Sequence, residues 1–270
     1  MNFPIKAAVL DWAGTMIDHG SRAPVIALQQ VFEEFGVPIL EPEARADMGR
    51  AKRDHVRSIL AMPRVAAAWR SQKGADALEA DVSAVHDALG PIMLEVTRST
   101  SDLIPGAAEL AARLRANGIR IGSCTGYTRP MMAAILPLAK VQGYAPDAVV
   151  CAGETIEGRP SPLMLWKALV EMGTWPASAC VKVDDAAVGI AEGKGAGTWT
   201  IGVAASGNGV GLDHGALLAL PPEERDRRIT GAAADLQAAG ADYVINTVAD
   251  LWPVLETIAG RIDAGEKPRP

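Results

Sequence analysis

The chain has 270 residues, of which 49% are hydrophobic and 21% are charged, and this balance excludes a disordered or collagen-like protein. Lysine and arginine together number 26 against 32 acidic residues, a net charge of −6 that provides no general basic field for a nucleic acid partner. The length corresponds to a little under two domains of about 150 residues.

The cysteines and the apolar runs bear on the cellular compartment. Cys124, Cys151 and Cys180 form no CxxC pair, so neither a disulfide framework nor a thiolate zinc site is indicated. The first apolar run ends at Asp11, which argues against a signal peptide, and no apolar run reaches the roughly 18 residues of a membrane span. We expect a cytoplasmic protein that does not engage a membrane.

Six short β-like segments alternate with segments of helical periodicity. Residues 105–117, opened by Pro105 and followed by Gly118, show the residue preferences of helix ends. This alternation predicts an α/β fold with a Rossmann-like parallel sheet covered by helices on both faces. The expected strands are residues 6–10, 119–123, 147–151, 180–183, 198–203 and 242–245.

Residues 21–99 interrupt the alternation. Apolar residues such as Val25, Leu28 and Phe32 recur there with helical spacing, and no strand is evident. We expect a helical cap domain inserted above the carboxyl ends of the strands, where open α/β folds bind ligands. The Rossmann-like catalytic core then comprises residues 1–20 and 100–264, and residues 265–270 form a flexible tail.

Asp11 follows the first apolar strand and precedes a turn that contains Ala13 and Gly14. Its carboxylate is expected at the carboxyl end of the sheet, where it can hold a metal ion or attack phosphorus and form an aspartyl phosphate. The alternative is an aspartate that only caps a turn or a helix. The residue type alone does not decide between the two.

Two more acidic residues, Asp184 and Asp185, follow another apolar strand. Adjacent carboxylates repel one another unless a cation or protons compensate, and a hard divalent ion such as Mg²⁺ takes oxygen ligands. We therefore expect a Mg²⁺ site here, with a solvated acidic turn as the alternative.

Thr125 and Gly126 follow a third strand, and Arg159 lies in a polar loop before a helix. The threonine hydroxyl and the backbone amides can bind phosphate oxygens, and the guanidinium can neutralise the anion. Each feature is weak alone, because a loop arginine is usually only solvated.

In this order the residues resemble the four motifs of the haloacid dehalogenase superfamily of phosphotransferases. Most phosphatases of that superfamily carry a second aspartate two residues after the nucleophile as general acid and base, whereas this chain has Ala13, which cannot protonate an alcohol leaving group. One family shares this substitution. DWAGT at 11–15, MGRAKRDHVR at 48–57 and TGYTR at 125–129 resemble the phosphonoacetaldehyde hydrolases, or phosphonatases.

This resemblance implies hydrolysis of the carbon–phosphorus bond of phosphonoacetaldehyde to acetaldehyde and phosphate. Because a simple carbanion is a poor leaving group, the reaction needs an electron sink, an imine of the aldehyde on Lys52, while Asp11 takes the phosphoryl group. Lys52 must be neutral to attack, so its pKa must fall from about 10.4 to near neutrality. Burial between cap and core and cations such as Arg50 and Arg53 would lower it.

The resemblance assigns roles to further residues. His55, three positions after Lys52 on the same helical face, would move protons or orient water, unless it only packs in the cap. The residues expected to bind substrate are Gly14, Thr15, Met48, Gly49, Thr125, Gly126, Tyr127 and Arg159. The alternatives are that Met48 is an ordinary core residue, that Gly49 only breaks a helix and that Tyr127 packs under the cap. Those expected to hold Mg²⁺ are Asp11, Asp185, Asp184 and, through its backbone carbonyl, Ala13.

Three positions, Ser21, Asp184 and Gly189, depart from the family pattern. Ser21 lies near the hinge, where some members have a cysteine, and we give it no role. Many members have Gly-Asp followed four residues later by another aspartate, whereas this chain has Asp184, Asp185 and then Gly189. Asp184 would then replace the missing acid from a different direction.

The resemblance also implies a homodimer formed through the caps, with Mg²⁺ and no organic cofactor. Two other functions stay open, namely a haloacid dehalogenase-type phosphatase of another substrate and a catalytically silent phosphometabolite-binding protein. Activity that survives the loss of Lys52 would favour the first, and Mg²⁺ binding without turnover would favour the second.

Overall fold

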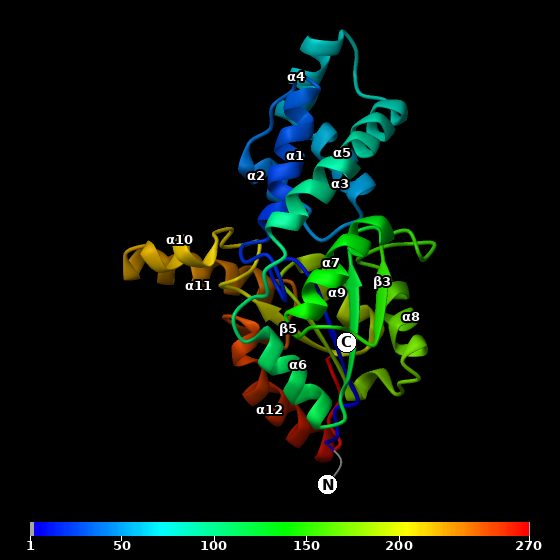
Figure 1. Cartoon of the computed structure of the whole chain (residues 1–270), viewed down its shortest axis with the longest axis vertical. Helices are drawn as coiled ribbons and strands as arrows, with labels where there is room; N and C mark the ends of the chain where they lie inside the picture. Colours follow the sequence, from blue (N-terminus) through cyan, green and yellow to red (C-terminus); the bar gives the residue numbers. More distant parts are fainter. Residues whose placement is uncertain (1–2, 270) are drawn as a thin grey trace.

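A six-stranded sheet with all strands parallel forms the centre of the lower part of the molecule in Figure 1, below a block of helices. The computed structural model describes residues 3–269, and the strand order is β3-β2-β1-β4-β5-β6. Each of the six expected strands is present, which confirms the prediction of an α/β fold with a parallel sheet. The strands are β1 (Ala7–Leu10), β2 (Arg120–Thr125), β3 (Ala148–Cys151), β4 (Cys180–Asp184), β5 (Trp199–Val203) and β6 (Tyr243–Ile245).

The strand order brings the predicted site residues to one edge of the sheet. β1 lies between β2 and β4, and Leu10 is in register with Val183. Asp11 therefore lies beside Asp184, the last residue of β4, and one residue from Thr125, the last residue of β2. Along the chain, β1 is followed by β2 and β3 on one side of it and then by β4, β5 and β6 on the other. The carboxyl end of β1 is therefore the switch point at which such sheets bind ligands.

Helices cover both faces of the sheet. They are α6 (Ala107–Ala116), α7 (Arg129–Val141), α8 (Leu163–Glu171), α9 (Ala187–Ala196), α10 (His214–Ala219), α11 (Pro222–Ala238) and α12 (Leu251–Asp263), with short 3-10 turns at Ala177–Ala179 and Val248–Asp250. Ala7 and Val9 of β1 belong to an apolar cluster with α8, whereas Ala8 and Leu10 belong to a larger cluster that includes α6 and α12. The apolar strands are thus buried on both sides.

Five further helices lie between β1 and α6 and form a block above the carboxyl ends of the strands (Figure 1). They are α1 (Arg22–Glu34), α2 (Glu41–Arg45), α3 (Lys52–Ala61), α4 (Pro63–Lys73) and α5 (Glu79–Ser99). α1 and α5 pack on each other, and Leu28, Val31 and Leu89 from them are fully buried. The expected helical insertion is confirmed, while the domain boundaries given above stay a prediction. No helix within residues 3–269 combines the length and the apolar character needed to cross a membrane.

The two connections between the sheet and this helical block run side by side. Ile17, in the first, forms an antiparallel bridge with Leu103, in the second. Asp18 and Ser21 of the first connection have φ values of 53° and 49°, a left-handed conformation that costs a residue with a side chain about 1–2 kcal/mol. The buried Asp18 carboxylate accepts a hydrogen bond from the Ala23 amide at 2.8 Å, which holds the connection in this shape.

Candidate active site

A narrow cavity lies between the carboxyl ends of the strands and the helical block. Most of the residues predicted for the site line it, and Ser21 and Pro24 line it as well. The predicted residues on the sheet side are Asp11, Ala13, Thr125, Gly126, Tyr127, Arg159 and Asp185, and those from the block are Met48, Gly49 and Lys52. Segments far apart in the sequence therefore meet around one small space.

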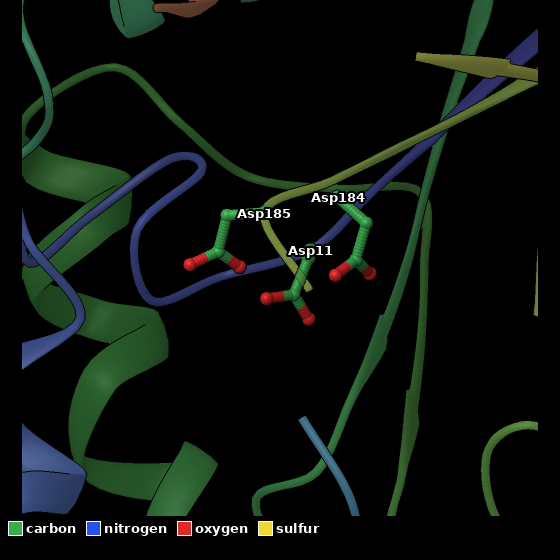
Figure 2. Close-up of side chains that lie close together, drawn as sticks. All are labelled: Asp11, Asp184 and Asp185. Atoms are coloured by element: carbon green, nitrogen blue, oxygen red, sulfur yellow. The ribbon is translucent and has the colours of Figure 1, made fainter. Parts of the chain in front are cut away.

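Three buried carboxylates converge at the strand ends (Figure 2). Oxygens of Asp11, Asp184 and Asp185 all lie within 4.8 Å of one another. Burial and the charge of Asp184 raise the pKa of Asp11 to about 6, and burial together with Asp11 raises the pKa of Asp185 well above its usual range. A bound cation would stabilise all three carboxylates in their charged form.

The negative charge of this cluster is only partly balanced by buried cations. Arg159 Nη2 lies 2.8 Å from Asp11 Oδ1 and 3.3 Å from Asp184 Oδ2. Lys182 Nζ lies 3.0 Å from Asp184 Oδ2, and both Lys182 Nζ and Arg159 Nε lie 3.0 Å from Glu192 Oε2. Counting the third aspartate, four carboxylates lie near two permanent positive charges, Arg159 and Lys182, and near the Lys52 amine. A bound divalent cation would offset the remaining negative charge.

Asp11 and Asp185 can hold such an ion. Asp11 directs Oδ1 to Arg159, and Asp185 Oδ2 accepts a hydrogen bond from the Asn208 amide at 2.7 Å, so each keeps a second oxygen for a metal. Asp184 uses Oδ2 toward Lys182 and accepts at Oδ1 from an amide of its own turn at 3.0 Å. The donor set is oxygen only, which fits a hard ion of the Mg²⁺ type.

Asp184 fills the space that a side chain at position 189 would need. Its side chain is fully buried, and a Cβ added to Gly189 would lie 2.0 Å from its Cγ. A carboxylate therefore reaches this place from β4, and glycine is required on α9 opposite it. The departures from the family pattern at positions 184 and 189 are thus one steric exchange.

Lys52 is the first residue of α3 and is 2% exposed. Burial lowers its pKa from 10.5 to about 8, with Asp11 opposing the change and Arg159 adding to it. Burial is the first cause, as expected, and the cation that adds to it is Arg159. Arg53 pairs with Glu79 at the surface. With a pKa of about 8, about one lysine in ten is neutral at pH 7.

His55 is fully buried on α3 and does not line the cavity. Its burial and the charge of Lys52 lower its pKa to about 3. The imidazole is therefore neutral at physiological pH, and it can orient a neighbour but has no imidazolium proton to give. The predicted role in moving protons stays a prediction.

The sheet side of the cavity offers hydrogen-bond donors for an anion. Arg159 Nη1 is buried and has no hydrogen-bond partner within residues 3–269. An unpaired buried donor costs free energy, and a phosphoryl oxygen is a suitable acceptor for a guanidinium. Thr125 Oγ1 accepts from the Tyr127 amide at 3.1 Å, which orders the turn on this side.

Gly14 and Thr15 do not line the cavity, although both were expected to bind substrate. A Cβ on Gly14 would lie 2.1 Å from Asp185 Oδ2, so glycine at this position makes room for that carboxylate. Thr15 is fully buried, and its hydroxyl has no hydrogen-bond partner in the part of the chain that the structure describes.

Two glycines allow the helical block to approach the sheet. A Cβ on Gly126 would lie 2.6 Å from the Arg50 carbonyl oxygen. Gly49 has a φ of 91°, and a Cβ there would lie 2.8 Å from a methyl group of Val188. The contact between the loop before α3 and the strand ends therefore depends on two positions that have no side chain.

Four further residues line the cavity or support it but belong to none of the sequence motifs, namely Lys182, Glu192, Asn208 and Pro24. A lysine between the two valines of an apolar strand was a usable indication for Lys182, because lysine is almost never fully buried unless it is paired. The other three carry no comparable pattern in the sequence.

Similar proteins bear on the identity of this site. A family model described as haloacid dehalogenase-like hydrolase matches residues 5–197. A phosphonoacetaldehyde hydrolase of Paraburkholderia xenovorans (strain LB400) is 50% identical over 98% of this chain and 99% of its own. One of Nitratidesulfovibrio vulgaris (strain DSM 19637 / Miyazaki F) is 43% identical over 99% and 95%. The crystal structure of a phosphonoacetaldehyde hydrolase-like protein from Oleispira antarctica is 43% identical, with a TM-score of 0.97 over 99% of this chain and 97% of that one.

Replacing Gly189 by alanine tests the packing against Asp184. The added methyl group would overlap the buried carboxylate, so the free energy of unfolding in urea should fall by about 1–3 kcal/mol. Gly231→Ala on α11 is the control, because a Cβ there meets nothing within 4 Å and alanine favours a helix by about 0.5–1 kcal/mol. Equal stability of the two variants would contradict the steric argument, and Asp184→Gly combined with Gly189→Asp should restore what Gly189→Ala loses.

Gly126→Ala tests the close approach of the helical block. Its methyl group would push against the Arg50 carbonyl, so the block should move away from the sheet and the radius of gyration in small-angle X-ray scattering should increase. Gly158→Ala is the matched control at the same boundary, because its Cβ would lie 3.8 Å from Ala51 Cβ, an ordinary contact. Identical scattering from both variants would show that this contact does not set the position of the block.

Proposed function

The chain belongs to the phosphonoacetaldehyde hydrolases, a family of haloacid dehalogenase-like hydrolases, and on that premise we propose that it hydrolyses the carbon–phosphorus bond of phosphonoacetaldehyde to acetaldehyde and phosphate. One observation carries the proposal. A buried amine of lowered pKa, Lys52, and a buried carboxylate, Asp11, line the same small cavity. Hydrolysis of a phosphate ester has no need of such an amine.

The reaction begins at Lys52. Its neutral amine adds to the aldehyde carbon, and loss of water with uptake of one proton from solvent leaves a protonated imine that links the substrate to the lysine. Burial serves this step because it raises the fraction of neutral amine. His55 lies near enough for the charge of Lys52 to lower its pKa, and in this proposal its neutral imidazole orients water during imine formation.

Phosphoryl transfer follows at Asp11. A carboxylate oxygen attacks phosphorus, the carbon–phosphorus bond breaks, and its electron pair moves into the iminium group to give an enamine on Lys52 and an aspartyl phosphate on Asp11. Arg159 Nη1 donates to a phosphoryl oxygen. Most phosphatases of the superfamily have an aspartate at the position of Ala13, which protonates an alcohol leaving group. The departing group here is a carbon atom, so that acid has no function, and alanine keeps a second carboxylate away from the imine.

Two hydrolyses complete the cycle. The enamine takes up a proton on carbon, and water releases acetaldehyde from the resulting imine and restores the Lys52 amine. A second water attacks the aspartyl phosphate, which releases phosphate and restores Asp11. Because imine formation gives off one water, the net reaction consumes one.

We propose Mg²⁺ as the ion of the acidic cluster. Asp11, Asp185 and the Ala13 carbonyl would hold it, and Asp184 would support them from behind, where it pairs with Lys182 and Arg159. When bound, the ion offsets the repulsion between the attacking carboxylate and the anionic phosphoryl group.

Residues 21–99 act in this proposal as a cap that closes over the aldehyde and excludes water. Lys52 belongs to the cap and Asp11 to the core, so closure brings the two reacting groups together. We further propose that two copies associate through their caps and that the enzyme works in the cytoplasm. Met48, Gly49 and Tyr127 line the aldehyde end of the cavity beside Lys52.

Lys52→Arg keeps the charge but cannot form the imine, so turnover of phosphonoacetaldehyde should be lost while the far-UV circular dichroism is retained. Mixing the wild-type enzyme with substrate and Mg²⁺, then adding borohydride, should leave a reduced adduct that peptide mapping places on Lys52. Lys167→Arg, on the surface of α8, is the control and should keep both turnover and adduct. Turnover by Lys52→Arg would contradict the imine mechanism.

The pH dependence follows from the direction of the Lys52 shift. The folded-state pKa of Lys52 is about 8. As the pH increases toward this value, the fraction of neutral amine rises about tenfold per pH unit, and above this value it levels off. The value of kcat/KM should therefore increase from pH 6.5 to about 8 and reach a plateau, measured as phosphate release at fixed ionic strength. A profile that is flat over this range would show that amine deprotonation does not limit the reaction.

A further inference from the structure

Arg45, the last residue of α2, reaches from the helical block to both the hinge and the sheet side of the molecule. Its Nη1 donates to the Gly20 carbonyl and to Asn208 Oδ1, each at 3.0 Å, and its Nη2 donates to the Gly211 carbonyl at 2.8 Å. The side chain is 15% exposed. A single guanidinium thus joins the block, its first connection and the loop after β5.

The same loop, residues 206–212, also contacts the hinge, which is the first connection between the sheet and the helical block. The Gly20 amide donates to the Ser206 carbonyl at 2.7 Å, and Ser206 Oγ donates to the Gly14 carbonyl at 2.8 Å. Gly20 has a φ of 89°, and a Cβ there would lie 2.4 Å from the Leu212 carbonyl oxygen. The hinge therefore lies directly on the loop that Arg45 holds.

The other side of this loop contacts the acidic cluster. The Asn208 amide donates to Asp185 Oδ2 at 2.7 Å, while the Asn208 side chain accepts from Arg45 and donates to the Arg45 carbonyl at 3.3 Å. Gly207 packs so closely that a Cβ there would lie 2.7 Å from Asp185 Cβ. One residue of the loop thus binds the cap through its side chain and Asp185 through its backbone.

We propose that Arg45 is a positioning residue that couples closure of the helical block to the affinity of the acidic cluster for a divalent cation. Docking of the block lets Arg45 fix Asn208, and the fixed Asn208 amide holds Asp185 in place. The coupling is reciprocal, so a bound cation in turn favours the docked block. The proposal rests on the proposed function only in taking Asp185 as a metal ligand.

The carbonyl and amide contacts carry this role, and the ion pair of Arg45 does not. Arg45 Nε lies 2.8 Å from Glu41 Oε1, but the glutamate side chain is 56% exposed, and an exposed pair of this kind contributes little. Arg64 is a matched arginine of the same block. It pairs with Glu43 and donates to the Pro38 carbonyl, which all belong to the block.

Calorimetric titration of the full-length protein with Mg²⁺ alone, in the absence of substrate, tests the coupling. Arg45→Met should raise the dissociation constant for Mg²⁺ by about tenfold or more, the size of effect seen when a group that supports a metal ligand is removed. Arg45→Lys should lie between Arg45→Met and the wild type, and Arg64→Gln and Glu41→Gln should stay within about twofold of the wild type. Small-angle scattering should show that Mg²⁺ makes the wild type more compact than Arg45→Met.

Wild-type Mg²⁺ affinity in Arg45→Met, or an equal loss in Arg64→Gln, would overturn the proposal. Asn208→Ala provides a second variant should Arg45→Met fail to fold, because it keeps the backbone amide at Asp185 and removes only the side-chain link to Arg45. It should weaken Mg²⁺ binding to a similar extent. The titration needs no substrate, so it tests the coupling separately from the reaction. Failure to turn over phosphonoacetaldehyde would refute the proposed function and would not affect the result of the titration.

Discussion

The excess of buried negative charge at the carboxyl ends of β1 and β4 is the constraint on which the rest of the site depends. Asp11, Asp184 and Asp185 lie within 4.8 Å of one another, and burial strengthens their mutual repulsion because little water is left to screen it. Arg159 and Lys182 reduce the repulsion without abolishing it. The site is therefore built to accept positive charge, and the remaining deficit matches a divalent ion.

Lys52 faces the same carboxylates from the helical block. It belongs to the helical block, and its pKa is low because the docked block buries it against the sheet. Moving the block away would return water to the amine and raise its pKa. The contact that buries the amine therefore also lowers its pKa, and Gly126 allows this contact while Arg45 bonds across it.

Much of the fold was accessible from local patterns. The strands are short apolar runs that end in polar residues, and the helical block has an apolar period that no strand could share, so both were predictable from the sequence. The residues around the cavity were also predictable as a set, because each follows a strand or belongs to a specific motif. The pairing of Lys182 with Glu192, the contact of Asn208 with Asp185 and the steric exchange between Asp184 and Gly189 were not, since nothing local indicates which side chains meet.

The cause of the lowered pKa of Lys52 illustrates the difference. Arg53 is adjacent in sequence but turns outward to Glu79, while Arg159, more than 100 residues away, lies across the cavity. By itself the sequence determined the alternation of strands and helices, the inserted helical segment and most of the residue types that line the cavity, because these depend on neighbouring residues. Only the tertiary structure decided the electrostatic environment of each group and the contact between block and sheet, because charges act through space and burial is a property of the whole fold.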